Sequence, residues 1–207
     1  APTAKQDSAE ISELCGNSPL AISIVGSFIK ENPDFPLTNI INSLREERRL
    51  MKPEGDEFIK EEKKEIEIID RDVQPIFNIV NRELKKETAT VLRKLALFAD
   101  SFDEKAEENI CGDRENEHLK RLVALKLIEY DPLNQRYFFH EVIRQLVSKE
   151  LRPSEKILTH RNLALYYFEV LTEANELYEQ DEEAAESALN MFDLNWANIQ
   201  AGQTWSA

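Results

Sequence analysis

Glycine and cysteine are scarce in this sequence, and their scarcity excludes several kinds of site. The chain has five glycines in 207 residues, and no G-x-x-x-x-G-K-[ST], G-x-S-x-G or H-E-x-x-H pattern occurs. Its two cysteines, Cys15 and Cys111, belong to apolar helical patterns and have neither disulfide-framework nor zinc-site spacing. We therefore expect no catalytic residue, no metal site and no enzyme activity in this chain, and a reducing compartment, the cytoplasm.

Long apolar runs and basic residues near the end of the chain are also missing. No stretch approaches the roughly eighteen apolar residues of a membrane span, and the first twenty residues lack the pattern of a signal peptide. No Lys or Arg follows Arg161, whereas nine carboxylates do. With a net charge of -14, the surface as a whole is poorly suited to nucleic acid or an anionic membrane, so we expect neither as a partner.

What is present is a mainly α-helical pattern in a globular chain, 42% of which is hydrophobic. Ser18 is the predicted N-cap of a helix that begins at Pro19 and, being apolar nearly all round, is expected to be buried. Thr38 is the predicted cap of the next helix. Residues 1–50 form one helical region by this pattern, and the charge-dense residues 51–72 are predicted to be a linker and an exposed helix.

The pattern changes again in residues 73–151. Helical periodicity begins at 73 and 91, Asp103 caps a short helix that ends at Gly112, and another helix follows near 117. Strand-favouring residues then flank the turn "DPLN", and a helix opens after His140. This order is typical of a winged helix-turn-helix domain with a small β-hairpin. Residues 152–207 add two longer helices, predicted to be an antiparallel pair that begins or ends a solenoid.

A winged helix suggests DNA binding, but the charges do not favour it. The predicted recognition helix would present the residues from Arg114 to His118 to bases, and Glu115 and Glu117 have the wrong sign for phosphates. Residues 87–151 hold ten basic and thirteen acidic side chains. We favour a structural scaffold, and keep a DNA-binding transcriptional regulator as one alternative and a non-enzymatic adaptor, with the acidic tail docking a basic partner, as another.

Residues 15–21 read "CGNSPLA" and interrupt two apolar helical segments. Gly16 and Asn17 allow a tight backbone turn, and the helix that starts at Pro19 presents unpaired N–H groups and a positive dipole end. By their chemistry alone these residues are an ordinary helix start. His140, a single histidine after apolar residues, is by the same standard an ordinary structural residue.

In combination, these segments resemble the NB-ARC type of STAND signalling ATPase. The helical subdomain of that family carries a G-x-P motif, usually Cys-Gly-Gly-Leu-Pro-Leu-Ala. The sequence matches it at Cys15, Gly16, Pro19, Leu20 and Ala21, and departs from it at Asn17 and Ser18. The segments "LALFADSF", "LKRLVALKLIEY" and "RYFFHEVIRQL" are similar to the family's winged helix, with Phe139, His140 and Glu141 where the family has Met-His-Asp. The later "HRNLALYYFEVL" and "NWANIQAG" look like the lead-in to tetratricopeptide-type sensors.

The resemblance implies a fragment of a signal-transduction switch. Gly16 and Pro19 would belong to the nucleotide site, with Pro19 on the adenine, while His140 would contact the β-phosphate and hold the ADP-bound resting state. ADP or ATP would be bound by the longer protein and not tightly by this chain, because the phosphate loop is expected in an N-terminal nucleotide-binding subdomain before Ala1. The other implied partners are a C-terminal helical-repeat sensor and, on activation, further copies in a homo-oligomer.

Overall fold

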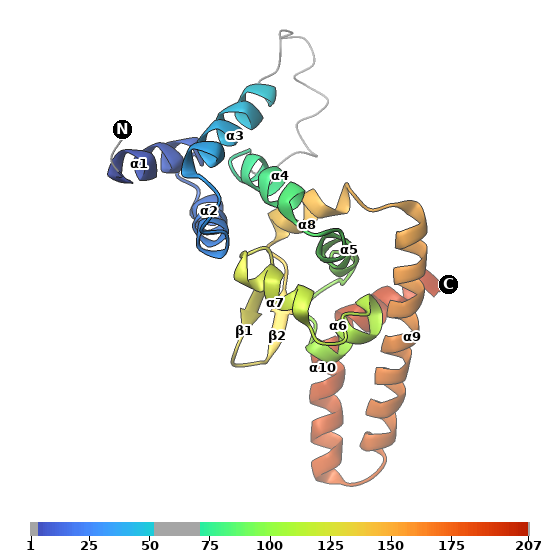
Figure 1. Ribbon diagram of the computed structural model, residues 1–207. Coiled ribbons are helices and arrows are strands. Elements are labelled where there is room, and N and C mark those ends of the chain that lie inside the picture. The colour runs from blue at the N-terminus through green and yellow to red at the C-terminus, as the bar shows by residue number, and fades with distance from the viewer. Residues whose placement is uncertain (1–3, 52–70, 207) are drawn as a thin grey trace, which may run out of the picture. The chain divides into compact units, whose positions relative to one another are not determined.

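The computed structural model describes residues 4–51 and 71–206. Within these ranges the chain forms ten helices and one two-stranded antiparallel sheet (Figure 1), which confirms the predicted mainly α-helical fold. The chain divides into two compact units: one comprises 1–85, 124–127 and 141–146, and the other comprises 86–123, 128–140 and 147–207. The predicted linker and helix at 51–72 fall almost entirely on residues 52–70, outside the described residues.

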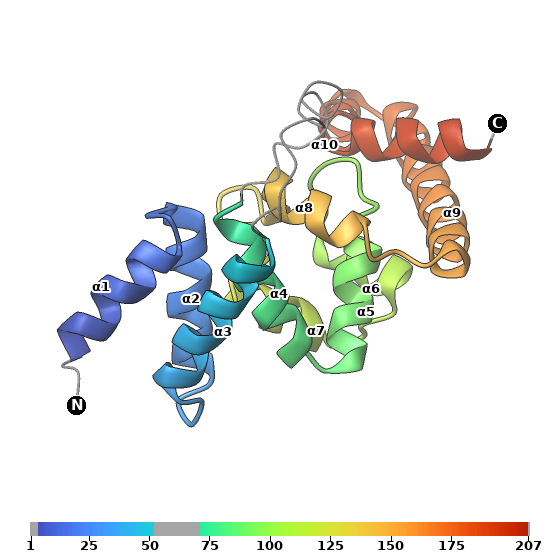
Figure 2. The same ribbon diagram turned by 90° about the horizontal axis from the view of Figure 1, so that it is seen from above.

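The first unit is built on four helices. They are α1 (Ala4–Leu14), α2 (Pro19–Glu31), α3 (Leu37–Leu50) and α4 (Val73–Glu83). Helix α1 packs on α3, and α2 and α3 both pack on α4 (Figure 2). The residues between these helices are almost fully removed from water, which makes them the core of the unit: Ile24, Phe28, Ile40, Leu44, Ile76 and Val80.

Helices α2 and α3 correct two predictions. Ser18 caps α2 as predicted, but only one face of α2 is buried, and Ile22 is 37% exposed. A single packing face recurs every three to four residues, so an apolar residue outside that spacing stays in water. Helix α3 begins at Leu37, because the Pro36 carbonyl already accepts the amides of Asn39 and Ile40. Thr38 therefore lies inside the first turn and is not the cap.

The second unit contains α5 (Lys86–Leu95), α6 (Glu104–Cys111) and α7 (Glu117–Ala124), the last residue of which is grouped with the first unit. Asp103 caps α6 by accepting the Ala106 amide at 2.7 Å, and Gly112 ends it at a φ of +83°, as the sequence predicts. Helix α8 (Glu141–Ser148) is divided between the two units after Leu146.

The predicted β-hairpin is confirmed as β1 (Glu129–Asp131) and β2 (Arg136–Phe138), with Tyr130 opposite Tyr137. Its turn is held by the Asp131 carboxylate, which accepts the Leu133 amide at 2.9 Å and the side-chain amide of Asn134 at 2.6 Å. Phe102 also bridges to Tyr137 through two backbone hydrogen bonds of 2.7 and 2.9 Å. The loop before α6 is thereby joined to β2, a pairing that the sequence did not predict.

Helices α9 (Pro153–Tyr178) and α10 (Glu182–Ser206) run antiparallel and side by side (Figures 1 and 2), as predicted. A Cβ added to Gly202 would lie 3.1 Å from the Ala164 Cα, so the two backbones approach closely at that point. Helix α9 also packs on α5 and α6. Among the helices of the described residues, none is both long and apolar enough to cross a membrane.

Candidate functional site

The turn between α1 and α2 explains the residue types of "CGNSPLA". Gly16 and Asn17 both have left-handed backbone conformations, with φ of +59° and +56°, and the Asn17 amide donates to the Ser12 carbonyl at 3.0 Å to close the end of α1. Ser18 then accepts the Ala21 amide, and Pro19 occupies the first turn of α2 without leaving an amide unpaired. The four residues end one helix and start the next within a single turn.

Gly16 is favoured for a second reason, which is the close approach of the Asp72 side chain. A Cβ on residue 16 would collide with the Asp72 carboxyl group. Arg48 of α3 forms an ion pair with this carboxylate through Nη2, and its Nε donates to the Leu14 carbonyl at the end of α1. Arg48 and Asp72 therefore tie the turn to α3 and to the start of α4.

Cys15, which precedes the turn, is fully buried. Burial is the main reason that the pKa of its thiol rises to about 11, and nearby Arg48 opposes this shift only in part. The thiolate is the nucleophilic form of cysteine, so a thiol with this pKa is poorly reactive at neutral pH. We interpret Cys15 as a packing residue of the first unit.

The structure brings together two of the three predicted site residues. Gly16 and Pro19 lie in one turn, and Pro19 is exposed. His140 belongs to the second unit, where it is exposed between β2 and α8. The contribution of all three residues to one nucleotide site stays a prediction.

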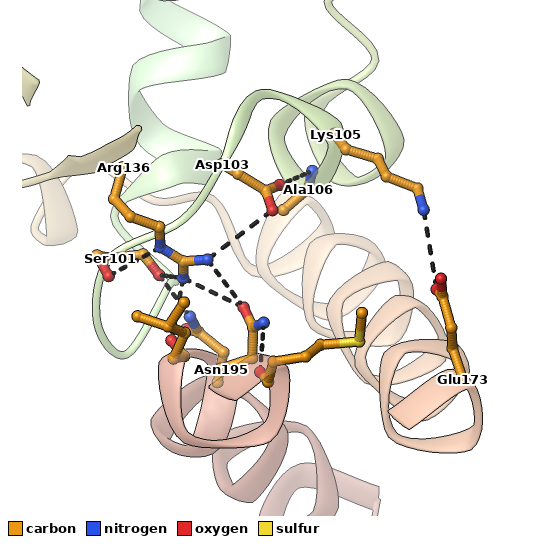
Figure 3. Close-up of polar contacts among 10 residues, drawn as sticks. Ser101, Asp103, Lys105, Ala106, Arg136, Glu173 and Asn195 are labelled. Atoms are coloured by element: carbon orange, nitrogen blue, oxygen red, sulfur yellow. Dashed lines mark hydrogen bonds and ion pairs between the residues drawn. The ribbon is translucent and has the colours of Figure 1, made fainter. Parts of the chain in front are cut away.

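The sequence did not predict the polar cluster around Arg136, which we call the Arg136 joint (Figure 3). The Arg136 side chain is 7% exposed, and it reaches from β2 to α10. Its Nη2 donates to the Ser101 carbonyl at 2.7 Å and to the Leu194 carbonyl at 3.1 Å, and Nη1 and Nη2 both donate to Asn195 Oδ1. Its Nε donates to Ser101 Oγ at 3.2 Å, so every nitrogen of the guanidinium has a partner.

Neighbouring side chains complete this joint. Asn198 Oδ1 accepts the Ala99 amide at 2.8 Å, and its Nδ2 donates to the Ser101 carbonyl at 2.8 Å. The Asp103 carboxylate, which caps α6, lies 3.8 Å from Arg136 Nη1. The loop before α6 is therefore held to α10 by side chains and to β2 by the Phe102 bridge. Asn195 and Asn198, two asparagines three residues apart among apolar residues, are the signal in the sequence that could have indicated this joint.

A buried carboxyl group, Glu107, lies on α6 of the same unit. Its Oε2 accepts the Asn116 side-chain amide at 3.0 Å, and its Oε1 has no hydrogen-bond partner. Burial raises the pKa of Glu107 to about 8; Asp113 and Glu108 add to this shift, while Asn116 and Lys94 oppose it. Glu107 is therefore mainly protonated at pH 7, which avoids placing a charge in the core.

Comparison of this chain with protein-family models, with curated proteins and with solved structures gave no match. Among the residues that the structure describes, no group of three or more His, Cys, Asp and Glu side chains is arranged to hold a metal ion.

Proposed function

We propose that this chain is the helical and winged-helix part of a nucleotide-dependent signalling switch of the NB-ARC type, with α9 and α10 as its first sensor helices. His140 holds the β-phosphate of ADP in the resting state, and Pro19 packs on the adenine. A nucleotide-binding subdomain of the same protein supplies the phosphate loop, and a helical-repeat sensor follows. The protein works in the cytoplasm and assembles with further copies of itself when activated.

The nucleotide site rests on the resemblance of the sequence motifs, and the Arg136 joint is the structural observation that supports a relay from α10 to His140. Arg136 lies four residues before His140, in a strand that is paired on one side with β1 and on the other with Phe102. Its guanidinium is bonded to Leu194 and Asn195 of α10. A displacement of α10 on ligand binding therefore changes the position of β2 and of the histidine that follows it, which is how a sensor biases a two-state switch.

The Gly16–Pro19 turn supports the nucleotide site. Its left-handed glycine and its Ser-Pro helix start give a defined backbone, and the exposed Pro19 ring offers a rigid apolar edge to a base. The chain has no phosphate loop, so it does not hydrolyse ATP by itself.

The DNA-binding alternative has less support. The carboxylate of Asp113 accepts the amides of Glu117, His118 and Leu119 at the start of α7, the predicted recognition helix. A fixed negative charge at the end that would meet the DNA weakens phosphate binding. Salt-dependent binding to a DNA duplex, followed by fluorescence anisotropy, would favour this alternative over the switch.

The test of the switch is ADP release from the longer protein. Replacing His140 by Ala removes a charge-assisted phosphate contact, so we expect ADP to dissociate about ten- to a hundredfold faster, and Pro19→Ala to have a smaller effect. His118→Ala is the control, because this histidine of α7 contacts Thr88 of α5 and not α10. Equal ADP dissociation from wild type and His140→Ala would contradict the proposed function.

A further inference from the structure

The side of α9 that points away from the core carries four large apolar side chains. Ile157, Leu158, Leu165 and Phe168 are 62%, 56%, 54% and 68% exposed. A helix turns by about 100° per residue, so these four side chains lie within an arc of about 100°, and the buried Val170 lies on the opposite side of the helix. Large apolar side chains that gather on one exposed face mark an interaction surface. We call this arc the outer face of α9.

Charged side chains give the outer face two different ends. Arg161 lies within the arc before Phe168, whereas Glu176 and Glu179 lie within it after Phe168. All three are exposed, and in the described part of the chain none of them has an ion-pair partner. The outer face is therefore positive before Phe168 and negative after it.

Arg161 and Glu176 are placed almost symmetrically about Phe168. Arg161 comes seven residues before it and Glu176 eight residues after it, which is about 10 and 12 Å along the helix axis. An antiparallel copy of the same face has these two positions exchanged. A two-fold axis beside Phe168 therefore puts each arginine opposite a glutamate.

We propose that the outer face of α9 binds the same face of a second copy of this chain, with the two helices antiparallel. Phe168 would contact its counterpart beside the two-fold axis, and Arg161 of each copy would pair with Glu176 of the other. Such an interface is isologous, because the same residues supply both of its sides. The surface goes beyond the proposed switch, since it requires neither a nucleotide nor further domains.

A second copy suits this face better than a further helix of a solenoid. A helix that continues a solenoid packs on the preceding repeat as a whole, along both α9 and α10. Ala164 and Leu171, which line a hollow between these two helices, lie outside the outer face. A reversed copy of the outer face also presents the matching order of charges, which the sequence of another helix does not guarantee.

Two features limit the strength of this dimer. Glu169 is the carboxylate nearest the axis, and it lies about 80° from Arg161, outside the arc, where water screens its charge. Each copy also has a net charge of -14, and one helix face is a small interface. We therefore expect a weak dimer, with a Kd on the order of 10–100 µM at physiological salt.

Sedimentation equilibrium of the full 207-residue chain, from about 5 to 500 µM, measures this dimer. Arg161→Glu and Glu176→Arg should each raise the Kd at least about tenfold, because either change sets like charges opposite each other on both sides of the axis. The double variant R161E/E176R restores opposite charges, so its Kd should return to within about threefold of the wild type. Phe168→Ala should also raise the Kd about tenfold, through lost apolar contact.

Lys156→Glu is the matched control for the charge reversals. It makes the same change of charge in the same helix as Arg161→Glu, but Lys156 is exposed about 140° from Arg161 around the helix. Its Kd should stay within about threefold of the wild type. Urea denaturation at about 1 µM, where the chain is monomeric, should show that all the variants fold.

A chain that stays monomeric at about 500 µM would overturn this proposal. So would a double variant that dimerises no better than the two single variants, because Arg161 and Glu176 would then not lie opposite each other. Equal weakening by Lys156→Glu and Arg161→Glu would contradict it as well, because the effect would then come from net charge and not from the outer face.

Discussion

In the first unit, the Gly16–Pro19 turn is shaped by backbone conformation and tied to its neighbours by Arg48 and Asp72, whose side chains are 32% and 36% exposed. In the second unit, the Arg136 joint is made by a guanidinium that is 7% exposed and bonded to a loop and to α10. Water screens the first ion pair, whereas the second arginine is shielded from water, so water does not replace its contacts if they are lost. The turn is thus suited to meeting a ligand, and the joint to holding elements together.

We expect Arg136→Ala to cause the largest loss of stability. The substitution leaves Asn195 Oδ1 and the carbonyls of Ser101 and Leu194 without this donor, so we expect the free energy of unfolding to fall by about 3–5 kcal/mol. Arg161→Ala, which removes an exposed arginine of α9, is the control and should change it by less than about 0.5 kcal/mol. Urea denaturation measures both. A loss below about 1 kcal/mol for Arg136→Ala would mean that the joint contributes little.

We expect a smaller loss of folding free energy for Gly16→Ala. This variant and its control separate the cost of a left-handed backbone from the cost of the contact with Asp72. A left-handed backbone costs an alanine about 1–2 kcal/mol, and moving the Asp72 carboxylate away from Arg48 to relieve the collision adds about 0.2–1 kcal/mol. Gly112→Ala is the matched control, since Gly112 has a φ of +83° but open space around it. Asp72→Ala in the Gly16→Ala background should recover part of the collision term. Equal losses for the two glycine variants would show that Asp72 does not constrain the turn.

Glu107→Gln tests whether the buried carboxyl group of Glu107, in the second unit, is neutral in the folded chain. The folded-state pKa of about 8 exceeds the ordinary value of 4.5, so the folded chain keeps a proton that the unfolded chain releases. This contribution favours the folded state fully below pH 4.5 and is lost as the pH rises to about 8. Gln cannot ionise, so the variant should lose this part of the pH dependence. Identical slopes for both proteins, from urea denaturation across this window, would contradict the buried neutral carboxyl.

The predictable part of the fold is the part set by neighbouring residues. Ser18 and Asp103 cap helices, Gly112 ends one, and Asp131 holds the hairpin turn, because each acts on backbone groups within a few residues. The exposure of Ile22 and the true start of α3 were missed. The first depends on which neighbours α2 has, and the second on the geometry of Pro36, so neither follows from apolar periodicity.

The candidate site likewise has a part that follows from neighbouring residues and a part that depends on residues distant in the sequence. The conformation of the Gly16–Pro19 turn follows from residue types, whereas the Arg136 joint connects residues separated by 35 and 59 positions in the chain. No local pattern marks such partners. The nucleotide site shared by Pro19 and His140 stays a prediction that comes from a family resemblance.

Amide hydrogen exchange at two positions tests most directly whether the joint makes β2 and α10 one cooperative element. The Tyr137 amide donates to the Phe102 carbonyl at 2.7 Å and reports on the hairpin, and the buried Ile199 reports on α10. In the wild type we expect both amides to exchange with the same opening free energy, and in Arg136→Ala we expect Ile199 to exchange at least about tenfold faster than Tyr137. Opening free energies that already differ in the wild type, or that stay equal in the variant, would contradict the coupling.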